Sequence, residues 1–138
     1  MKTLHTAYRV TDLEISLDFY AALGYREVSR VDIGNGATLT MLKFPDEDVV
    51  TLEIVHRPAA GAAVEIGSGF SHLVVQVDDI ATTVDALTDA GLRPEPLEHP
   101  GGPDGPTTSY LGDPDGYRIE LVQWPPGHPD GITVADSN

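Results

Sequence analysis

The sequence predicts an α+β fold made of two tandem βαβββ modules, and three observations support this prediction. The chain matches itself without a gap when the segment from Leu4 is shifted by 67 residues onto the segment from Ser71. Each copy begins with an apolar extended run that leads into a run with helical spacing. Each copy then continues through shorter extended segments separated by turn residues. A match at one fixed offset indicates a structural unit that occurs twice.

The first copy contains one predicted helix among predicted strands. Leu4 to Val10 is expected to be a strand. Asp12 can cap a helix, and Gly24 can end it in a left-handed conformation. The apolar positions that keep helical spacing between these two residues are Leu13, Leu17, Tyr20 and Leu23. Three further strands are expected near residues 25–32, 37–44 and 49–56, with breaks at Gly34-Asn35-Gly36 and Pro45-Asp46.

The second copy has the same order of elements. Phe70 to Val77 is expected to be a strand, and a helix is expected from Asp79 to about Ala90, ended by Gly91. Further strands are expected near residues 92–98, 107–111 and 117–124. Five prolines precede Thr107, at positions 94, 96, 100, 103 and 106. Because proline has no amide hydrogen, this stretch is a poor continuous strand and much of it is predicted to be a loop.

The repeat also predicts module boundaries. The first module is expected at residues 1–57 and the second at 69–124. Residues 58–68, with their Pro, Ala and Gly, form the predicted linker, and the polar segment 125–138 is predicted to be a loose tail. A chain of 138 residues suits one domain as well as two half-size units that share a core.

Composition and charge restrict the expected partners. With 22 acidic and 8 basic residues, the formal net charge is −14. Such a charge repels phosphate backbones and anionic lipids, so neither nucleic acid nor membrane partners are expected. The absence of cysteine excludes disulfides, thiolate metal sites and cysteine nucleophiles. The first residues run directly into a predicted strand without an apolar stretch of signal-peptide length, so we expect a cytoplasmic protein.

Two histidines and two glutamates are related by the repeat. The offset that pairs His5 with His72 also pairs Glu53 with Glu120. Each histidine lies near the start of the first strand of its copy, and each glutamate lies in the last strand, 48 residues later. Two imidazoles and two carboxylates suit a first-row divalent ion with positions left for water or substrate. We therefore predict that the two sheets close around a central cavity where these four residues bind one metal ion.

Each of these residues also has an ordinary explanation when it is taken alone. His5 would be an edge-strand histidine and His72 a hydrogen-bonded core histidine. Glu53 and Glu120 lie between aliphatic neighbours, so strand alternation places their carboxylates either in solvent or in a polar cavity. The shared offset is what favours one joint site.

Two segments of the chain carry motifs that resemble those of a known family. They are LHTAYRVTDLEISLDFYAALGY, from Leu4, and DPDGYRIEL, residues 113–121. The first is similar to the N-terminal signature of glyoxalase I (lactoylglutathione lyase), and the second to its C-terminal signature. This family belongs to the vicinal-oxygen-chelate or glyoxalase/bleomycin resistance superfamily. The likeness covers roughly residues 4–123. It places on family positions His5, Arg9, Glu53, His72 and Glu120.

The resemblance implies a reaction and roles for these residues. The implied enzyme is a lyase of methylglyoxal detoxification, which isomerises a thiol–methylglyoxal hemithioacetal to the S-2-hydroxyacyl thioester through an enediolate. It implies nickel, cobalt or zinc bound by His5, Glu53, His72 and Glu120, and a low-molecular-weight thiol such as glutathione as co-substrate. Glu120 is the implied base, Glu53 the other ligand or its stereochemical counterpart, and Arg9 the anchor of the thiol carboxylate. A homodimer is also implied, because sites in the family usually form between paired subunits.

The chain departs from the family where the thiol is bound. His56-Arg57 stand where the family has an Asn shortly after the first Glu. The loop HPGGPDGPTTSY, from His99, lacks the basic residue that often precedes a Gly-Gly-Thr-Thr sequence in the family. These departures leave the identity of the thiol open. Three histidines without repeat partners are expected on the surface, namely His56, His99 and His128.

Other functions of the same superfamily remain alternatives. A metal-dependent epimerase similar to methylmalonyl-CoA epimerase uses related enolate chemistry, although its ligand at the position of Glu53 is typically Gln. Extradiol dioxygenases and fosfomycin-type thiol transferases use three ligands, and Glu53 would be a fourth. A non-catalytic drug binder of the bleomycin-resistance kind lacks the four-ligand set. Metal content after purification separates the enzymes from the binder.

Overall fold

A computed structural model describes residues 1–58, 61–128 and 131–134. Residues 59–60 of the predicted linker, and 129–130 and 135–138 of the predicted tail, lie outside the described part. Neither helix in the described ranges is both long and apolar enough to span a bilayer.

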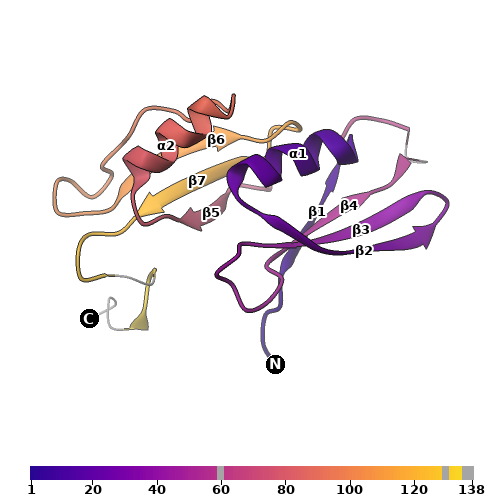
Figure 1. The fold of residues 1–138 in the computed structure, drawn as a ribbon, viewed down its shortest axis with the longest axis horizontal. Coiled ribbons are helices and arrows are strands. Elements are labelled where there is room, and N and C mark those ends of the chain that lie inside the picture. The colour runs from indigo at the N-terminus through magenta and orange to yellow at the C-terminus, as the bar shows by residue number, and fades with distance from the viewer. Residues whose placement is uncertain (59–60, 129–130, 135–138) are drawn as a thin grey trace. The chain divides into compact units, whose positions relative to one another are not determined.

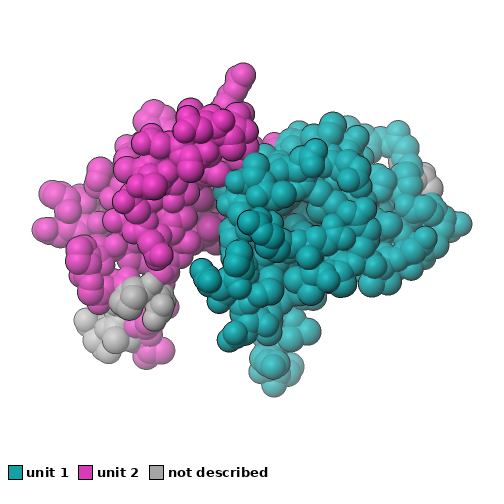
Figure 2. Space-filling model, in the orientation of Figure 1, with its two compact units in different colours: residues 1–67, 114–116 teal, residues 68–113, 117–138 magenta. Residues whose placement is uncertain are grey.

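The chain divides into two compact units, which Figure 2 shows in different colours. Unit 1 consists of Met1–Gly67 and Pro114–Gly116, and unit 2 consists of Ser68–Asp113 and Tyr117–Asn138. The short segment 114–116 belongs to unit 1, where Asp115 forms a hydrogen bond with Thr11. Its Oδ2 atom accepts a hydrogen bond of 3.0 Å from the Thr11 amide. The predicted module boundaries at 57, 68 and 124 stay a prediction.

Unit 1 is a four-stranded mixed sheet with one helix (Figure 1). Its elements are β1 (Thr6–Val10), α1 (Leu13–Leu23), β2 (Arg26–Gly34), β3 (Ala37–Lys43) and β4 (Leu52–His56). The strand order is β1-β4-β3-β2, with β1 parallel to β4 and the other neighbours antiparallel. The sequence predicted each element of this unit. The last strand is shorter than predicted and begins at Leu52.

Both ends of α1 have the predicted cap chemistry. The Oδ1 atom of Asp12 accepts a hydrogen bond of 3.0 Å from the Ile15 amide, which satisfies one of the unpaired donors of the first turn. At the other end, Gly24 has a φ angle of 122°, and its amide donates to the carbonyls of Tyr20 and Ala21. Side chains rarely tolerate this backbone conformation, so glycine ends the helix without strain.

One face of the unit 1 sheet forms a core with α1. Side chains alternate along a strand, and the buried side chains of β1 and β4 are Tyr8, Val10, Leu52 and Ile54. Tyr20 of α1 is fully buried, and its hydroxyl group hydrogen-bonds the hydroxyl group of Tyr8. Full burial of one aliphatic side chain contributes about 1.5–3 kcal/mol. The helix thus covers one face, and Glu53 lies on the opposite face of the sheet with Ala7 and Met41.

Unit 2 is a three-stranded mixed sheet with one helix. Its elements are β5 (Leu73–Gln76), α2 (Ile80–Asp89), β6 (Thr107–Gly112) and β7 (Arg118–Gln123). The order is β5-β7-β6, with β5 parallel and β6 antiparallel to β7. The helix α2 contacts β6 and β7, and its buried side chains are Ile80 and Leu87. The two units together confirm the predicted α+β class.

The strand predicted at residues 92–98 is wrong as a regular strand. The segment lies beside β6 but makes only separate contacts with it. The Glu95 amide donates a hydrogen bond of 2.7 Å to the Tyr110 carbonyl, and Glu98 forms an isolated bridge to Thr108. The two prolines of this segment lack amide hydrogens and interrupt the ladder. The second module is therefore βαββ, with an isolated bridge in place of the strand expected directly after the helix.

The described start of the predicted tail contacts unit 2. Trp124 stacks on His128, with ring centroids 4.6 Å apart and an interplanar angle of 21°. These two residues also line a small pocket together with Gln76 and Gln123. The prediction that His128 is a surface residue is corrected, because this stacking leaves it half-buried.

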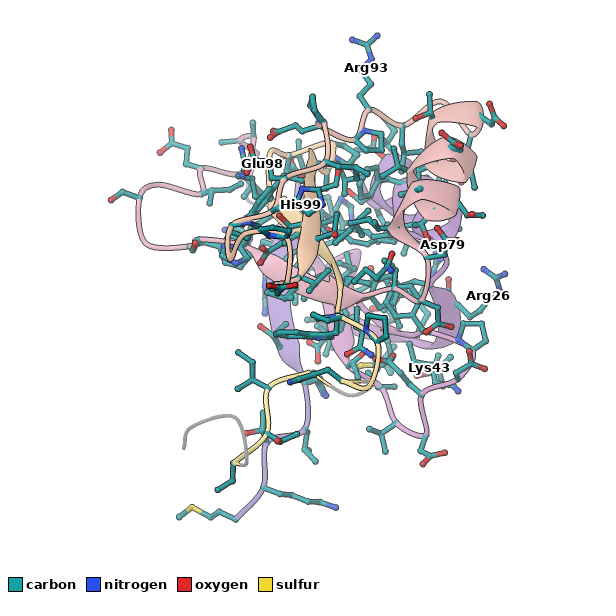
Figure 3. The ribbon with its side chains drawn as sticks, turned by 90° about the vertical axis from the view of Figure 1, so that its left-hand side faces the viewer. Arg26, Lys43, Asp79, Arg93, Glu98 and His99 are labelled. Carbon is teal, nitrogen blue, oxygen red and sulfur yellow. The ribbon has the colours of Figure 1, made fainter. Side chains whose placement is uncertain are left out.

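The cap of α2 predicts a pH-dependent contribution to stability. Asp79 lies at the start of α2 (Figure 3), and its Oδ1 atom accepts a hydrogen bond of 2.9 Å from the Thr82 amide. This bond lowers the pKa of Asp79 below its ordinary value. A carboxylate with a lowered folded-state pKa stabilises the fold above its unfolded pKa of about 4, and this contribution is lost as the pH falls through the folded value. We expect Asp79→Ala to reduce the free energy of unfolding at pH 7, in urea denaturation.

The difference between Asp79→Ala and the wild type should shrink steadily as the pH is lowered from 4 to 2. Asp78→Ala is the matched control, because Asp78 is the preceding exposed carboxylate and does not cap the helix. It should leave the free energy of unfolding nearly unchanged throughout. A deficit of Asp79→Ala that persists undiminished at the lowest pH would contradict the role of the charged cap.

Candidate functional site

The sheet face opposite the helix carries the predicted ligands of unit 1. Ala7 of β1 and Met41 of β3 both pair with Glu53 of β4, so the three side chains share one face. His5 directly precedes β1 and lies on the same face as Ala7, two residues later. The Nε2 atom of His5 is 2.8 Å from Oε2 of Glu53. The two side chains are 25% and 14% exposed, so solvent reaches both.

His72 and Glu120 form the corresponding pair in unit 2. Val74 of β5 pairs with Glu120 of β7, which repeats the register of Ala7 with Glu53. The Nε2 atom of His72 is 3.1 Å from Oε2 of Glu120. Both histidines directly precede their strands, so the prediction that they lie within the strands is corrected by one residue.

The second histidine is also held from its other side. The Oγ atom of Ser71 forms a hydrogen bond of 2.7 Å with Nδ1 of His72. A hydrogen bond at one ring nitrogen orients the ring and leaves the other nitrogen directed at its partner. The residue before His5 is Leu4, which offers no such group. The two pairs are therefore alike in backbone register and different in their supporting side chains.

Three further side chains lie around the second pair. Tyr110 of β6 pairs across the strands with Glu120. Its ring meets His72 edge to face, with centroids 5.8 Å apart. The guanidinium carbon of Arg118 lies 4.5 Å from the centroid of the Tyr110 ring. Arg118 in turn donates a hydrogen bond of 3.2 Å to Oε2 of Glu95.

Tyr110 was not among the predicted site residues, because a uniform shift of 67 residues aligns it with Lys43. The strand registers give a different counterpart, since Met41 pairs with Glu53 as Tyr110 pairs with Glu120. The offset between Met41 and Tyr110 is thus two residues longer than the offset between the two His–Glu pairs. Only the strand pairing reveals this equivalence, and no signal in the sequence pointed to it.

The spacing within each pair fits two adjacent ligands of one metal ion. Imidazole nitrogen and carboxylate oxygen bind first-row divalent ions at about 2.0–2.2 Å, so two such ligands at right angles lie about 3 Å apart. The two pairs measure 2.8 Å and 3.1 Å. Each pair supplies two donors, half of the predicted set. Within residues 1–58, 61–128 and 131–134, no three His, Asp or Glu side chains form a metal-binding group. A joint site of all four stays a prediction.

Arg9 and the histidines without repeat partners lie at separate places. Arg9 is exposed and lies on the ligand face of β1, two residues beyond Ala7. His56 is half-buried at the end of β4, so its prediction as a surface residue is corrected. His99 is exposed, as predicted, in the loop before β6, where Figure 3 shows it with Glu98.

The sequence matches a family described as the Glyoxalase/Bleomycin resistance protein/Dioxygenase superfamily over residues 2–121. This match spans most of the chain and includes both His–Glu pairs. The chain belongs to this superfamily, as its motifs predicted.

Curated relatives narrow the class. A protein of Synechocystis named "Probable lactoylglutathione lyase" is 35% identical over 131 residues, which cover 89% of this chain and 95% of the relative. The lactoylglutathione lyase of Neisseria meningitidis serogroup A is 34% identical over 131 residues, which cover 89% of this chain and 91% of the relative. The chain is accordingly an enzyme of the lactoylglutathione lyase-like kind.

Solved structures agree with this class. Glyoxalase I from Zea mays is 26% identical, with a TM-score of 0.76 over 88% of this chain and 44% of that one. A bleomycin-binding protein in complex with bleomycin is 23% identical, with a TM-score of 0.64 over 89% of this chain and 98% of that one. The second likeness shows the shared fold alone.

The surroundings of Tyr110 predict a high pKa for its phenol. Burial, followed by the hydrogen bond and the negative charge of Glu120, raises the pKa of Tyr110 above its ordinary value of about 10. Ultraviolet titration of the wild type and of Tyr110→Phe should give a difference spectrum that develops above pH 10. In Glu120→Gln, which removes the charge, the same transition should move to lower pH. A difference spectrum that stays unmoved in Glu120→Gln would contradict the contact.

Proposed function

We propose that the chain isomerises a thiol–methylglyoxal hemithioacetal to the S-2-hydroxyacyl thioester with a divalent metal ion as cofactor, which is the reaction of a glyoxalase I. The observation that carries this proposal is the His–Glu contact that occurs once in each unit with the same strand register. The similarity to lactoylglutathione lyases supports this reaction among those that the superfamily performs.

The metal would be held by His5, Glu53, His72 and Glu120. Nickel, cobalt and zinc all accept this set of neutral imidazoles and carboxylates. When bound, such an ion polarises the adjacent oxygens of the substrate and makes the C–H bond beside the carbonyl more acidic. Each unit supplies two of the four donors, so a complete site requires both units, within one chain or between two paired chains.

Glu120 would move the proton. Its carboxylate takes the proton from one carbon of the substrate and returns it to the neighbouring carbon, so the enzyme is unchanged after each cycle. The Glu120 side chain is 16% exposed, so it is mostly enclosed but still reached by solvent. Glu53 would serve as the other carboxylate ligand.

Arg9 would bind the carboxylate of the thiol. The net charge of −14 repels an anionic substrate, so a local cation is needed to receive it. Arg9 is exposed on the same face as the first His–Glu pair. Glutathione is one thiol that would fit this role. Because the residues at 56 and 57 depart from the family pattern, another low-molecular-weight thiol would fit it as well.

The enzyme would act as a homodimer in the cytoplasm. Each chain would consist of two modules, residues 1–57 and 69–124, joined by the linker 58–68. Analytical ultracentrifugation measures the assembly, and a monomer with full activity would overturn the dimer.

Removal of the base should abolish most of the turnover. General bases contribute about 10²–10⁴-fold to rate, so Glu120→Gln should lower kcat for the hemithioacetal by a factor in that range. Glu65→Gln is the control, because it removes an exposed carboxylate outside the strands. Assays that follow thioester formation measure both variants. An unchanged kcat in Glu120→Gln would overturn its assignment as the base.

Metal removal tests the reaction class itself. Activity with a panel of methylglyoxal hemithioacetals, each made with a different thiol, should disappear on chelation and return with nickel, cobalt or zinc. If no hemithioacetal reacts with any metal, the proposed reaction fails. Racemisation of a 2-methylacyl thioester would then favour the epimerase. A protein that retains no metal and gains no activity would favour the drug binder.

A further inference from the structure

The two His–Glu pairs have the same strand register but different cross-strand neighbours. In unit 1 the residue opposite Glu53 is Met41, whose thioether is a weak acceptor and cannot donate a hydrogen bond. In unit 2 the residue opposite Glu120 is Tyr110, whose hydroxyl group is a hydrogen-bond donor on the same face of the sheet as the Glu120 carboxylate. A phenol can donate to a carboxylate and a thioether cannot, so only the second carboxylate has a side-chain donor at this cross-strand position.

Tyr110 is itself fixed by its surroundings. Its ring meets His72 with an interplanar angle of 81°. The Arg118 guanidinium lies over the ring at 4.5 Å, a cation–π contact. Glu95 completes the arrangement, because its carboxylate accepts a hydrogen bond from Arg118 and its amide donates one to the Tyr110 carbonyl. These contacts hold the ring beside His72, whose Nε2 atom is 3.1 Å from Oε2 of Glu120.

We propose that Tyr110 is a positioning residue for Glu120. Its hydroxyl group orients the carboxylate toward Nε2 of His72, and it retains the carboxylate beside the substrate while the proton is carried from one carbon to the next. Glu53 faces Met41 and has no such support from across the strand. The two glutamates therefore have unequal roles, with Glu53 a ligand and Glu120 both ligand and base.

This inference rests on the proposed function for its second half and on the contacts within unit 2 for its first half. The two halves can be tested separately, because the orientation of Glu120 affects the metal-free protein as well as turnover. Outer hydrogen-bond partners of metal ligands typically change affinity or activity by about 10–100-fold when they are removed.

Tyr110→Phe is the test variant, because it keeps the ring between His72 and Arg118 and removes only the hydroxyl group. Met41→Leu is the matched control, since it changes the equivalent position of unit 1 without removing a donor. We expect Tyr110→Phe to weaken Co²⁺ binding to the metal-free protein by about 10–100-fold in calorimetry. The visible spectrum of the Co²⁺-loaded variant should also change. Met41→Leu should change neither.

Kinetics provide a second readout. In Tyr110→Phe, kcat for the hemithioacetal should fall by about 10-fold or more while KM changes little, since the substrate anchor at Arg9 is untouched. A purely structural role of Tyr110 would lower the melting temperature and leave the Co²⁺ spectrum and kcat unchanged. That result would overturn the proposal.

Carbon-13 NMR of the metal-free protein separates the two halves. The side-chain carboxyl signal of Glu120 should shift in Tyr110→Phe and stay in place in Met41→Leu. An unmoved signal together with unchanged Co²⁺ affinity overturns the positioning role and leaves the proposed function standing. A wild type that turns over no hemithioacetal overturns the proposed function, and a shifted Glu120 signal in Tyr110→Phe would still establish the contact.

Discussion

The parallel pairing of the first and last strand in each unit is the constraint on which the candidate site depends. Ala7 lies opposite Glu53 and Val74 lies opposite Glu120, so the same register occurs twice. Strand alternation then directs each glutamate away from the helix and toward the histidine that precedes the first strand. A slip of one residue would turn the carboxylate into the apolar core, where an unpaired charge is costly. The packing of the core thereby fixes which face carries the His–Glu pair.

The two units also show how far a repeat can diverge without losing this geometry. In both units the backbone register places a His Nε2 atom close to a Glu Oε2 atom, at 2.8 Å in unit 1 and 3.1 Å in unit 2. The supporting side chains differ, since the second pair has Ser71 and Tyr110 where the first has Leu4 and Met41. The two His–Glu pairs are alike and their supporting side chains differ, and this difference is the physical basis for the different roles that we propose for the two glutamates.

Much of the fold could be predicted from the sequence, because the capping residues and the spacing of apolar residues indicated the same elements. The side-chain oxygens of Asp12 and Asp79 cap the starts of the two helices. Glycines with positive φ angles, Gly24 and Gly91, lie at the helix ends. The prediction of a strand at residues 92–98 was wrong because two prolines in this segment have no amide hydrogen to donate to a neighbouring strand. The environment of Glu120 could not be read at all, because strand registers, and not a uniform shift, decide which residue faces it.

The segment beside β6 also bears on how the molecule avoids unwanted association. An outer strand with a full row of free amides and carbonyls is a template on which another chain can add as a further strand. Here the segment with Pro94 and Pro96 lies along β6, takes up hydrogen bonds at Glu95 and Glu98, and offers no continuous row of donors of its own. Because its prolines prevent this segment from forming a regular strand, the segment covers the edge of β6 and makes the addition of a strand from another chain unfavourable.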